Sequence, residues 1–302
     1  MYFGHSNFLA SAVFPFINGQ WIWFTVAAFL AGALNAVAGG GSFFSFPAML
    51  GMNIPPVQAN ATNTVALWPG QLTSVAAYRE DIRRNLPLVW PMALAGFLGG
   101  ALGAIVLLHT PQTTFMHLVP WLLLVAASLF AMTGPVSRWL EHRRVYSVPV
   151  EDEGAHIHPT LRPLNSNPGS SGAISPGSSS LRSPRHLPMF VAVAAVCFYI
   201  GYFGAGSGFL LITILSLAGF QDLNEINALK VVSTTTANGT AFVIFVVGNQ
   251  VVWRYCLMAM VTSALGGYFS ARFARRIPQS ILRGLIFLIG FSMSAWFFFK
   301  GN

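Results

Sequence analysis

Two glycine runs in this sequence have the composition of anion-binding backbone. Residues 38–43 read Ala-Gly-Gly-Gly-Ser-Phe and residues 204–209 read Gly-Ala-Gly-Ser-Gly-Phe, each inside a long apolar stretch. Because glycine breaks helices, each run should end one helix and start another. The start of a helix exposes unpaired N–H groups and a partial positive charge, which an oxyanion can reach where no side chain stands in the way. The predicted binding residues at the two runs are Gly39, Gly40, Gly41, Ser42, Gly204, Gly206, Ser207 and Gly208.

The apolar segments near the two glycine runs carry polar side chains at matched positions. Asn60 lies in the first half of the chain and Asn227 lies 167 residues later. Buried amides are costly in lipid, so this pair is a better candidate for substrate contact than the neighbouring hydroxyl groups, which can bond between helices instead. The predicted substrate-binding residues outside the glycine runs are Asn35, Asn60, Asn63, Thr64, Asn227, Lys230 and Thr234.

Lys230 lies inside a predicted membrane-spanning segment, and its match in the first half is Asn63. The two halves therefore differ in charge at this position. A cation there could attract an anionic substrate. The side chain could equally snorkel to the interface or pair locally, because Glu225 precedes it by five residues. The sequence leaves both interpretations open.

Composition assigns the chain to the membrane. Hydrophobic residues make up 54% of it and charged residues 8%, against about 25% charged in a soluble domain. The long apolar segments lack the alternation of an outer-membrane barrel, so we predict an all-α polytopic protein in a lipid bilayer. The net charge of +8 comes mostly from arginines that flank these segments. That placement is typical of topology anchors and not of a nucleic-acid-binding face.

Several motifs are missing from the sequence. The predicted spanning segments contain no aspartate or glutamate, so a carboxylate site for protons or sodium of the common kind is not apparent. There is no P-loop and no Ser/His/Asp or His-Glu-x-x-His motif. Cys197 and Cys256 lie far apart in apolar runs, without metal or disulfide spacing. We therefore predict no catalytic residues, no cofactor, no metal and no ATP drive within this chain.

The chain divides into two membrane halves, 1–133 and 187–302, and a linker, 134–186, whose Pro, Gly and Ser content predicts flexibility. The halves are internal repeats, because short motifs recur at intervals of 166 or 167 residues. Glycines four apart, such as Gly96 and Gly100, predict close helix packing. The matched motifs are Gly40 with Gly206, Asn60-Ala61 with Asn227-Ala228, Gly99-Gly100 with Gly266-Gly267, and Pro111-Gln112 with Pro278-Gln279.

Arginine marks cytoplasmic loops, and it falls in non-equivalent loops of the two halves. Three arginines lie in 79–84, whereas the second half carries Arg272, Arg275 and Arg276, which match the uncharged turn around 109–112. We therefore predict inverted-topology repeats, with the linker cytoplasmic and both termini outside. Because the linker and the two termini lie on opposite sides of the membrane, each half must cross it an odd number of times. An odd number fits three spanning helices plus a glycine-broken helix hairpin, which the short arms favour, or five crossings.

These residues carry a family resemblance. The stretch 32–42, followed by Pro47 and by Asn-Ala-Thr-Asn at 60–63, resembles the first repeat of the sulfite exporter TauE/SafE family. The stretch 201–208, followed by Asn227-Ala228 and Lys230, resembles its second repeat. The resemblance covers both membrane halves and omits the linker. It implies a multi-pass protein of the inner membrane that exports sulfite or organosulfonates.

The predicted function is therefore secondary transport of a small anion by alternating access around the two glycine-broken hairpins. The alternative is a membrane-embedded receptor or enzyme that binds an anion there without moving it. Proton coupling and a homodimer are both compatible with the sequence, which decides neither.

Overall fold

The computed structural model describes residues 19–38, 40–128, 186–220 and 222–273, with scattered positions between 284 and 298. Every regular element in these described residues is an α-helix, so the predicted all-α class is confirmed for this part of the chain. All but the last residue of the predicted linker falls outside the described residues, and its flexibility stays a prediction.

The described part of the first half consists of helices separated by short turns. They are α2 (Gly19–Ala38), α3 (Ser42–Gly51), α4 (Pro56–Ala77), α5 (Arg79–Arg84), α6 (Leu86–His109) and the helix Gln112–Ser128. Pro56 suits the first turn of α4, where a backbone N–H is not needed. The stretch that the sequence places in a charged loop folds as α5, because acidic residues in its first turn and arginines in its last turn complement the helix dipole.

The described part of the second half begins with the same order of a long helix, a short helix and a long helix. They are α8 (His186–Tyr202), α9 (Ser207–Leu217) and α10 (Leu223–Val247), and α11 (Trp253–Phe273) follows. The Asp222 side chain caps α10 by accepting a hydrogen bond from the Asn224 N–H at 2.9 Å. Asn53 (φ 60°) follows α3 and Gly219 (φ 104°) follows α9, so both short helices end at a left-handed residue.

The helices that follow the two glycine breaks are short compared with α6 and α10. Among the described residues, α6 and α10 are both long and apolar enough to cross a membrane. The arms α3 and α9 have 10 and 11 residues. At ~1.5 Å per residue they reach only about half of a ~30 Å hydrocarbon core. They therefore fit the predicted hairpin arms better than full crossings.

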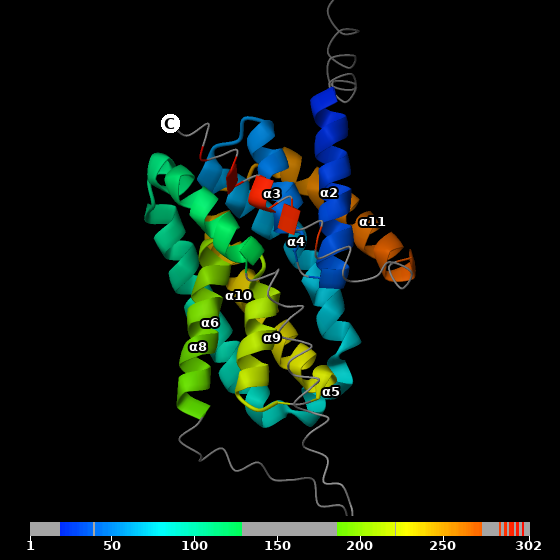
Figure 1. The fold of residues 1–302 in the computed structure, drawn as a ribbon, viewed down its shortest axis with the longest axis vertical. Helices are drawn as coiled ribbons and strands as arrows, with labels where there is room; N and C mark the ends of the chain where they lie inside the picture. The colour runs from blue at the N-terminus through cyan, green and yellow to red at the C-terminus, as the bar shows by residue number, and fades with distance from the viewer. Residues whose placement is uncertain are drawn as a thin grey trace, which may run out of the picture.

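Figure 1 shows how the two broken helix pairs lie along the long axis of the molecule. The pair α2–α3 occupies the upper part of the view, and the pair α8–α9 occupies the lower part. Helix α5 lies at the lower end, opposite the start of α2. The two glycine breaks thus lie toward the middle of the molecule, and their arms extend to opposite ends.

The two halves pack as interlocked units, because α6 packs on α8 and α11 packs on α2. Glycine makes both contacts close. A Cβ added at Gly266 of α11 would lie 1.9 Å from the Phe29 carbonyl oxygen, and one added at Gly103 of α6 would lie 2.1 Å from the Phe198 carbonyl oxygen. Gly96 and Gly100 face α10 in the same way, which confirms the close packing predicted from their spacing.

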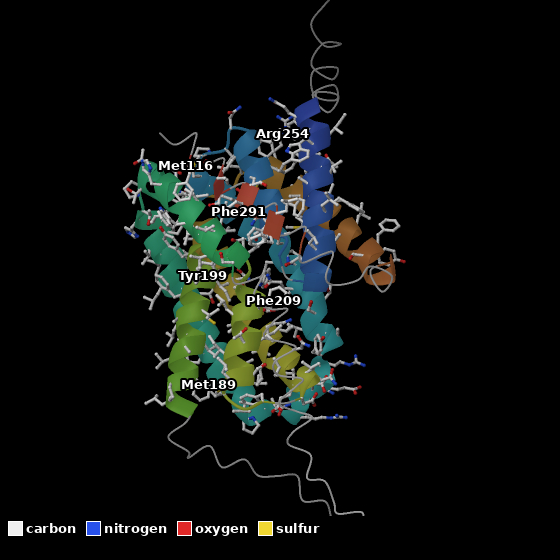
Figure 2. All side chains as sticks on the ribbon, viewed as in Figure 1. Met116, Met189, Tyr199, Phe209, Arg254 and Phe291 are labelled. Carbon is white, nitrogen blue, oxygen red and sulfur yellow. The ribbon has the colours of Figure 1, made fainter. Side chains whose placement is uncertain are left out.

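Aromatic residues join α2 and α11 at the upper end of the molecule. The rings of Trp21 and Tyr255 stack with centroids 5.1 Å apart, and the Arg254 guanidinium lies 4.6 Å from the Trp21 ring. Figure 2 shows Arg254 near this end and Met189 near the other. Large apolar side chains such as Trp90 (74% exposed) point outward. An apolar surface of this kind is what a lipid environment requires.

Candidate functional site

The first glycine break folds α3 back against α2. Gly40 and Gly41 are buried between the two helices, and Gly39 lies outside the described residues. A Cβ added at Gly41 would lie 2.4 Å from the Ala31 carbonyl oxygen, and its next contact would be the Asn35 Cβ at 3.0 Å. Because the backbone of Gly41 is helical (φ −57°), the close approach of α2 requires glycine here, and backbone conformation does not.

The second glycine break is a short turn with left-handed residues. Gly204 (φ 77°) and Gly206 (φ 72°) both adopt a conformation that side chains disfavour. The Ser207 hydroxyl donates to the Gly204 carbonyl at 2.9 Å, and the Tyr199 hydroxyl donates to the Ala205 carbonyl at 2.7 Å. The turn is therefore fixed from within, by its own serine and by a tyrosine of α8. Figure 2 places Tyr199 and Phe209, on either side of this turn, near mid-height of the molecule.

Asn63 of α4 forms hydrogen bonds with two serines at the start of α3. Its amide N–H donates to the Ser42 hydroxyl at 3.1 Å, and its amide oxygen accepts a short hydrogen bond from the Ser45 hydroxyl. Ser45 also bonds the Gly41 carbonyl at 3.2 Å. Asn63 and Ser45 are each 1% exposed. The amide is thus satisfied on both sides by the hairpin that it supports.

Lys230 of α10 occupies the matching place in the second half. The space where a Gly208 Cβ would stand lies 3.9 Å from the Lys230 Cδ atom, so the lysine chain runs beside the first turn of α9. Its ammonium donates to the Asn227 amide oxygen at 2.9 Å. Thr234 lies one turn further along α10 and bonds the Lys230 carbonyl at 2.9 Å. The half-buried ammonium of Lys230 therefore lies beside the start of α9. At the matching place beside α3, the first half has the neutral amide of Asn63, which is hydrogen-bonded on both sides.

Asn60 connects the two halves at the second break. Its amide N–H donates to the carbonyl of Tyr202, the last residue of α8, at 3.0 Å. The side chain is 1% exposed, and its amide oxygen has no hydrogen-bond partner among the described residues. Thr64 bonds the Asn60 carbonyl at 3.0 Å within α4. A helix of the first half thus supports the end of the broken helix of the second half.

An aromatic cluster packs between the two hairpins. The ring of Phe46, on α3, meets the ring of Phe203, at the second break, with centroids 5.4 Å apart and nearly perpendicular planes. Phe115 contacts both rings at 6.2 to 6.3 Å. Edge-to-face contacts of this kind are favourable for buried rings. They fix the first hairpin against the second break.

The structure brings the predicted residues together in two groups. Asn60 links them through its bond to the Tyr202 carbonyl, and Thr64 bonds the Asn60 carbonyl within α4. The first group is Asn35, Gly40, Gly41, Ser42 and Asn63, and the second is Gly204, Gly206, Ser207, Gly208, Asn227, Lys230 and Thr234. Sequence reasoning missed Ser45 and Tyr199. The spacing of Ser45, three residues after Ser42 on the same helix face, could have indicated it. Whether any of these residues contacts a substrate stays a prediction.

The described residues contain no group of three or more His, Cys, Asp or Glu side chains placed to hold a metal ion. The polar atoms at the two breaks are instead amides, hydroxyls and one ammonium group. These groups can bind an anion by hydrogen bonds and charge, and they include no nucleophile paired with a base.

In the part of the chain that the structure describes, two glycine-broken helix pairs lie toward the middle of an apolar, helical molecule, which is an arrangement typical of membrane transporters. A family model described as Sulfite exporter TauE/SafE matches residues 24–297. The chain belongs to this family, and it is accordingly a membrane-embedded protein of the transporter class.

Curated relatives match over almost the whole chain. A probable membrane transporter protein of Haemophilus influenzae is 26% identical, covering 90% of this chain and 94% of its own. The probable membrane transporter protein ORF9 of a Sinorhizobium species is 27% identical, covering 89% and 88%. The probable membrane transporter protein YfcA of Escherichia coli K12 is 23% identical, covering 89% and 86%. No solved structure matches the chain significantly.

Proposed function

We propose that this protein is a secondary transporter that moves a small anion, sulfite or an organosulfonate, across the bacterial inner membrane by alternating access. The observation that carries the proposal is the matched construction of the two hairpins. Each is broken by glycines, and the second arm of each meets the residue at the same repeat position of the next long helix, Asn63 or Lys230. Membership of a sulfite exporter family supports an anion as the substrate.

Two inverted repeats, each with a hairpin and three spanning helices, account for the arrangement of the helices. The hairpins extend to opposite ends of the molecule (Figure 1). The interlock is reciprocal as well, since α6 of the first half packs on α8 while α11 of the second half packs on α2. An inversion of one repeat onto the other explains both features, because it exchanges equivalent helices and reverses their direction.

The anion is held at the second hairpin. The start of α9 supplies backbone N–H groups, and Lys230 supplies a positive charge beside them. The Ser207 hydroxyl holds the turn in place, since its proton bonds the Gly204 carbonyl. A sulfite or sulfonate group presents three oxygens that accept hydrogen bonds, which suits a site made of donors. Gly208 keeps the approach open, because a Cβ there would have Lys230 as its one close neighbour, at 3.9 Å.

Orientation follows from the positive-inside rule. The exposed arginines of α5 and the linker face the cytoplasm, and both termini face outward. The start of α2 and the position of α5 at opposite ends of the molecule are compatible with this orientation (Figure 1).

The test is flux in proteoliposomes. Purified protein is reconstituted, and uptake and efflux of sulfite and sulfoacetate are measured with and without a proton gradient. Gly40→Leu and Gly206→Leu should each abolish flux while the protein still inserts. A side chain at Gly206 strains the left-handed residue (φ 72°) that precedes the α9 N–H groups, and a side chain at Gly40 has to fit a buried position at the turn between α2 and α3. Lys230→Gln should weaken apparent affinity or rate without blocking the path.

Normal transport by both leucine variants would refute the hairpin site. If Lys230→Gln transports with the same kinetics as the parent, the Lys230 side chain only snorkels to the membrane interface and does not attract the substrate. Anion binding to the purified protein without any flux would favour the alternative class, a receptor or an enzyme. A rate that follows the proton gradient would identify protons as the coupling ion.

A further inference from the structure

Two hydrogen bonds between α4 and α10 join residues that are one repeat interval apart. The Trp68 indole N–H donates to the Thr235 carbonyl at 3.0 Å, and the Asn238 amide donates to the Gln71 amide oxygen at 3.1 Å. Both pairs are separated by 167 residues. The same interval relates Asn60 to Asn227 in the sequence. Each of these residues therefore contacts its own equivalent in the other half.

A residue can touch its own equivalent only near the symmetry axis that relates the two repeats. The paired residues thus mark where this axis passes, which is close to the middle of both helices. The packing there is close. A Cβ added at Gly239 would lie 3.0 Å from the Trp68 indole nitrogen, and the rings of Trp68 and Phe242 lie 4.9 Å apart. These two contacts join non-equivalent residues, so they describe the packing beside the axis in the present state.

We propose that this α4–α10 crossing is the fixed pivot of the transport cycle and keeps its contacts in both access states. The proposal rests on alternating access by inverted repeats. In that mechanism the second state arises when the two repeats exchange conformations. When the repeats exchange conformations, the two members of an equivalent pair exchange places. The same two residues therefore stay in contact in both states. A contact between non-equivalent residues is replaced by a contact between their two equivalents, so the original contact is lost.

The choice of side chains fits a contact that must persist. Gln71 and Asn238 are both primary amides, and an amide carries a donor and an acceptor. Their hydrogen bond can therefore form in either direction after the exchange. An unpaired amide at this depth would be costly in lipid, which explains why two amides face each other at the middle of two spanning helices.

Contacts away from the axis belong to one state only. The backbone N–H of Val252 donates to the Thr62 hydroxyl at 3.0 Å, and the two residues are 190 apart. The Asn60 amide bonds the Tyr202 carbonyl across 142 residues. Under the exchange this second bond becomes one between Asn227 and the carbonyl of residue 36.

Crosslinking tests the pivot. In a protein with Cys197→Ala and Cys256→Ala, one variant carries Gln71→Cys with Asn238→Cys, and a matched variant carries Thr62→Cys with Val252→Cys. A short bis-methanethiosulfonate reagent links each pair, and efflux of sulfoacetate is measured before and after reduction. Sulfoacetate is the probe because sulfite itself cleaves disulfides. The axial pair should keep at least half of the unlinked flux, and the off-axis pair should lose at least tenfold and recover on reduction.

A second readout does not depend on transport. Hydrogen–deuterium exchange of the hairpin amides at 203–209 should be unchanged by the axial crosslink and slowed by the off-axis one. Loss of flux that reduction restores, or at least tenfold slower exchange, in the axial variant overturns the pivot. If the unlinked parent transports no anion, the proposed transport function is refuted. The hydrogen–deuterium exchange data alone then test whether this crossing is a fixed pivot.

Discussion

The contact between α2 and α11 yields the sharpest stability prediction. Gly266 of α11 faces the Phe29 carbonyl oxygen of α2, and Gly32 of α2 faces the Ser263 carbonyl oxygen of α11. In each case an added Cβ would stand 1.9 Å from that oxygen, whereas Cβ atoms essentially never approach closer than 3.0 Å. The obstacle is backbone, so no rotamer change relieves it. Gly266→Ala must push the two helices apart by about 1.1 Å.

A displacement of this size loses much of the dispersion energy across the interface, because a gap of ~0.5–1 Å already forfeits a quarter to a half of each contact. Overpacking typically costs about 1–3 kcal/mol, and the upper part of that range applies here. For a chain of this size the apparent melting temperature in detergent should fall by roughly 5 °C. The double variant Gly32→Ala/Gly266→Ala should lose less than the sum of the single losses, because the first methyl group has already separated the helices.

Thermal unfolding of purified protein, followed by tryptophan fluorescence, measures these shifts. Gly51→Ala and Gly70→Ala are matched controls, because a Cβ added at either glycine has nothing within 4 Å. They should leave the melting temperature unchanged or raise it slightly, as alanine favours helix over glycine by up to ~1 kcal/mol. If Gly266→Ala melts within 1 °C of the parent, the two halves are not interlocked as described.

Three further predictions concern transport and topology. Gly208→Ala should leave the melting temperature unchanged, because its Cβ meets Lys230 at an ordinary 3.9 Å, yet flux assays should show apparent anion affinity reduced several-fold by the methyl group beside the α9 backbone. Deleting residues 165–180 should leave assembly and flux nearly intact, since loop entropy changes slowly with length; loss of assembled protein would mean that the segment docks. Cysteines introduced at Ser170 and Asn302 should label from opposite sides of intact cells, and labelling from one side would contradict inverted repeats.

Local chemistry made the hairpins predictable from the sequence. Three consecutive glycines at 39–41 cannot continue a buried helix, and the structure ends α2 and starts α3 there. Pro55 and Pro56 likewise predicted where α3 gives way to α4. The matched intervals of Asn60 and Asn227 predicted that the two halves resemble each other. Each of these signals depends on a few neighbouring residues, which is why the sequence alone carries it.

Long-range partners were not predictable in the same way. The glycine pairs of α6 predicted close packing but not that Gly99 and Gly103 face α8 while Gly96 and Gly100 face α10. Periodicity gives the face of a helix, but it does not name the helix that covers this face. The hydrogen bonds of Asn63 to Ser42 and Ser45 depend on how α4 packs on α3, and the bond of Trp68 to Thr235 depends on how the two halves fit together. No local pattern records either arrangement.

The difference between Asn63 and Lys230 bears on how many anions one cycle carries. Two equal hairpins would offer two equal sites. The amide at position 63, however, is neutral and is bonded on both sides by Ser42 and Ser45, so it has no unmatched charge to offer to an anion. Among the residues that the structure describes, the Lys230 ammonium bonds one amide oxygen, that of Asn227. An anion beside α9 balances the charge of this ammonium. We therefore expect one sulfoacetate bound per chain in calorimetric titration of the purified protein, and two would contradict this asymmetry.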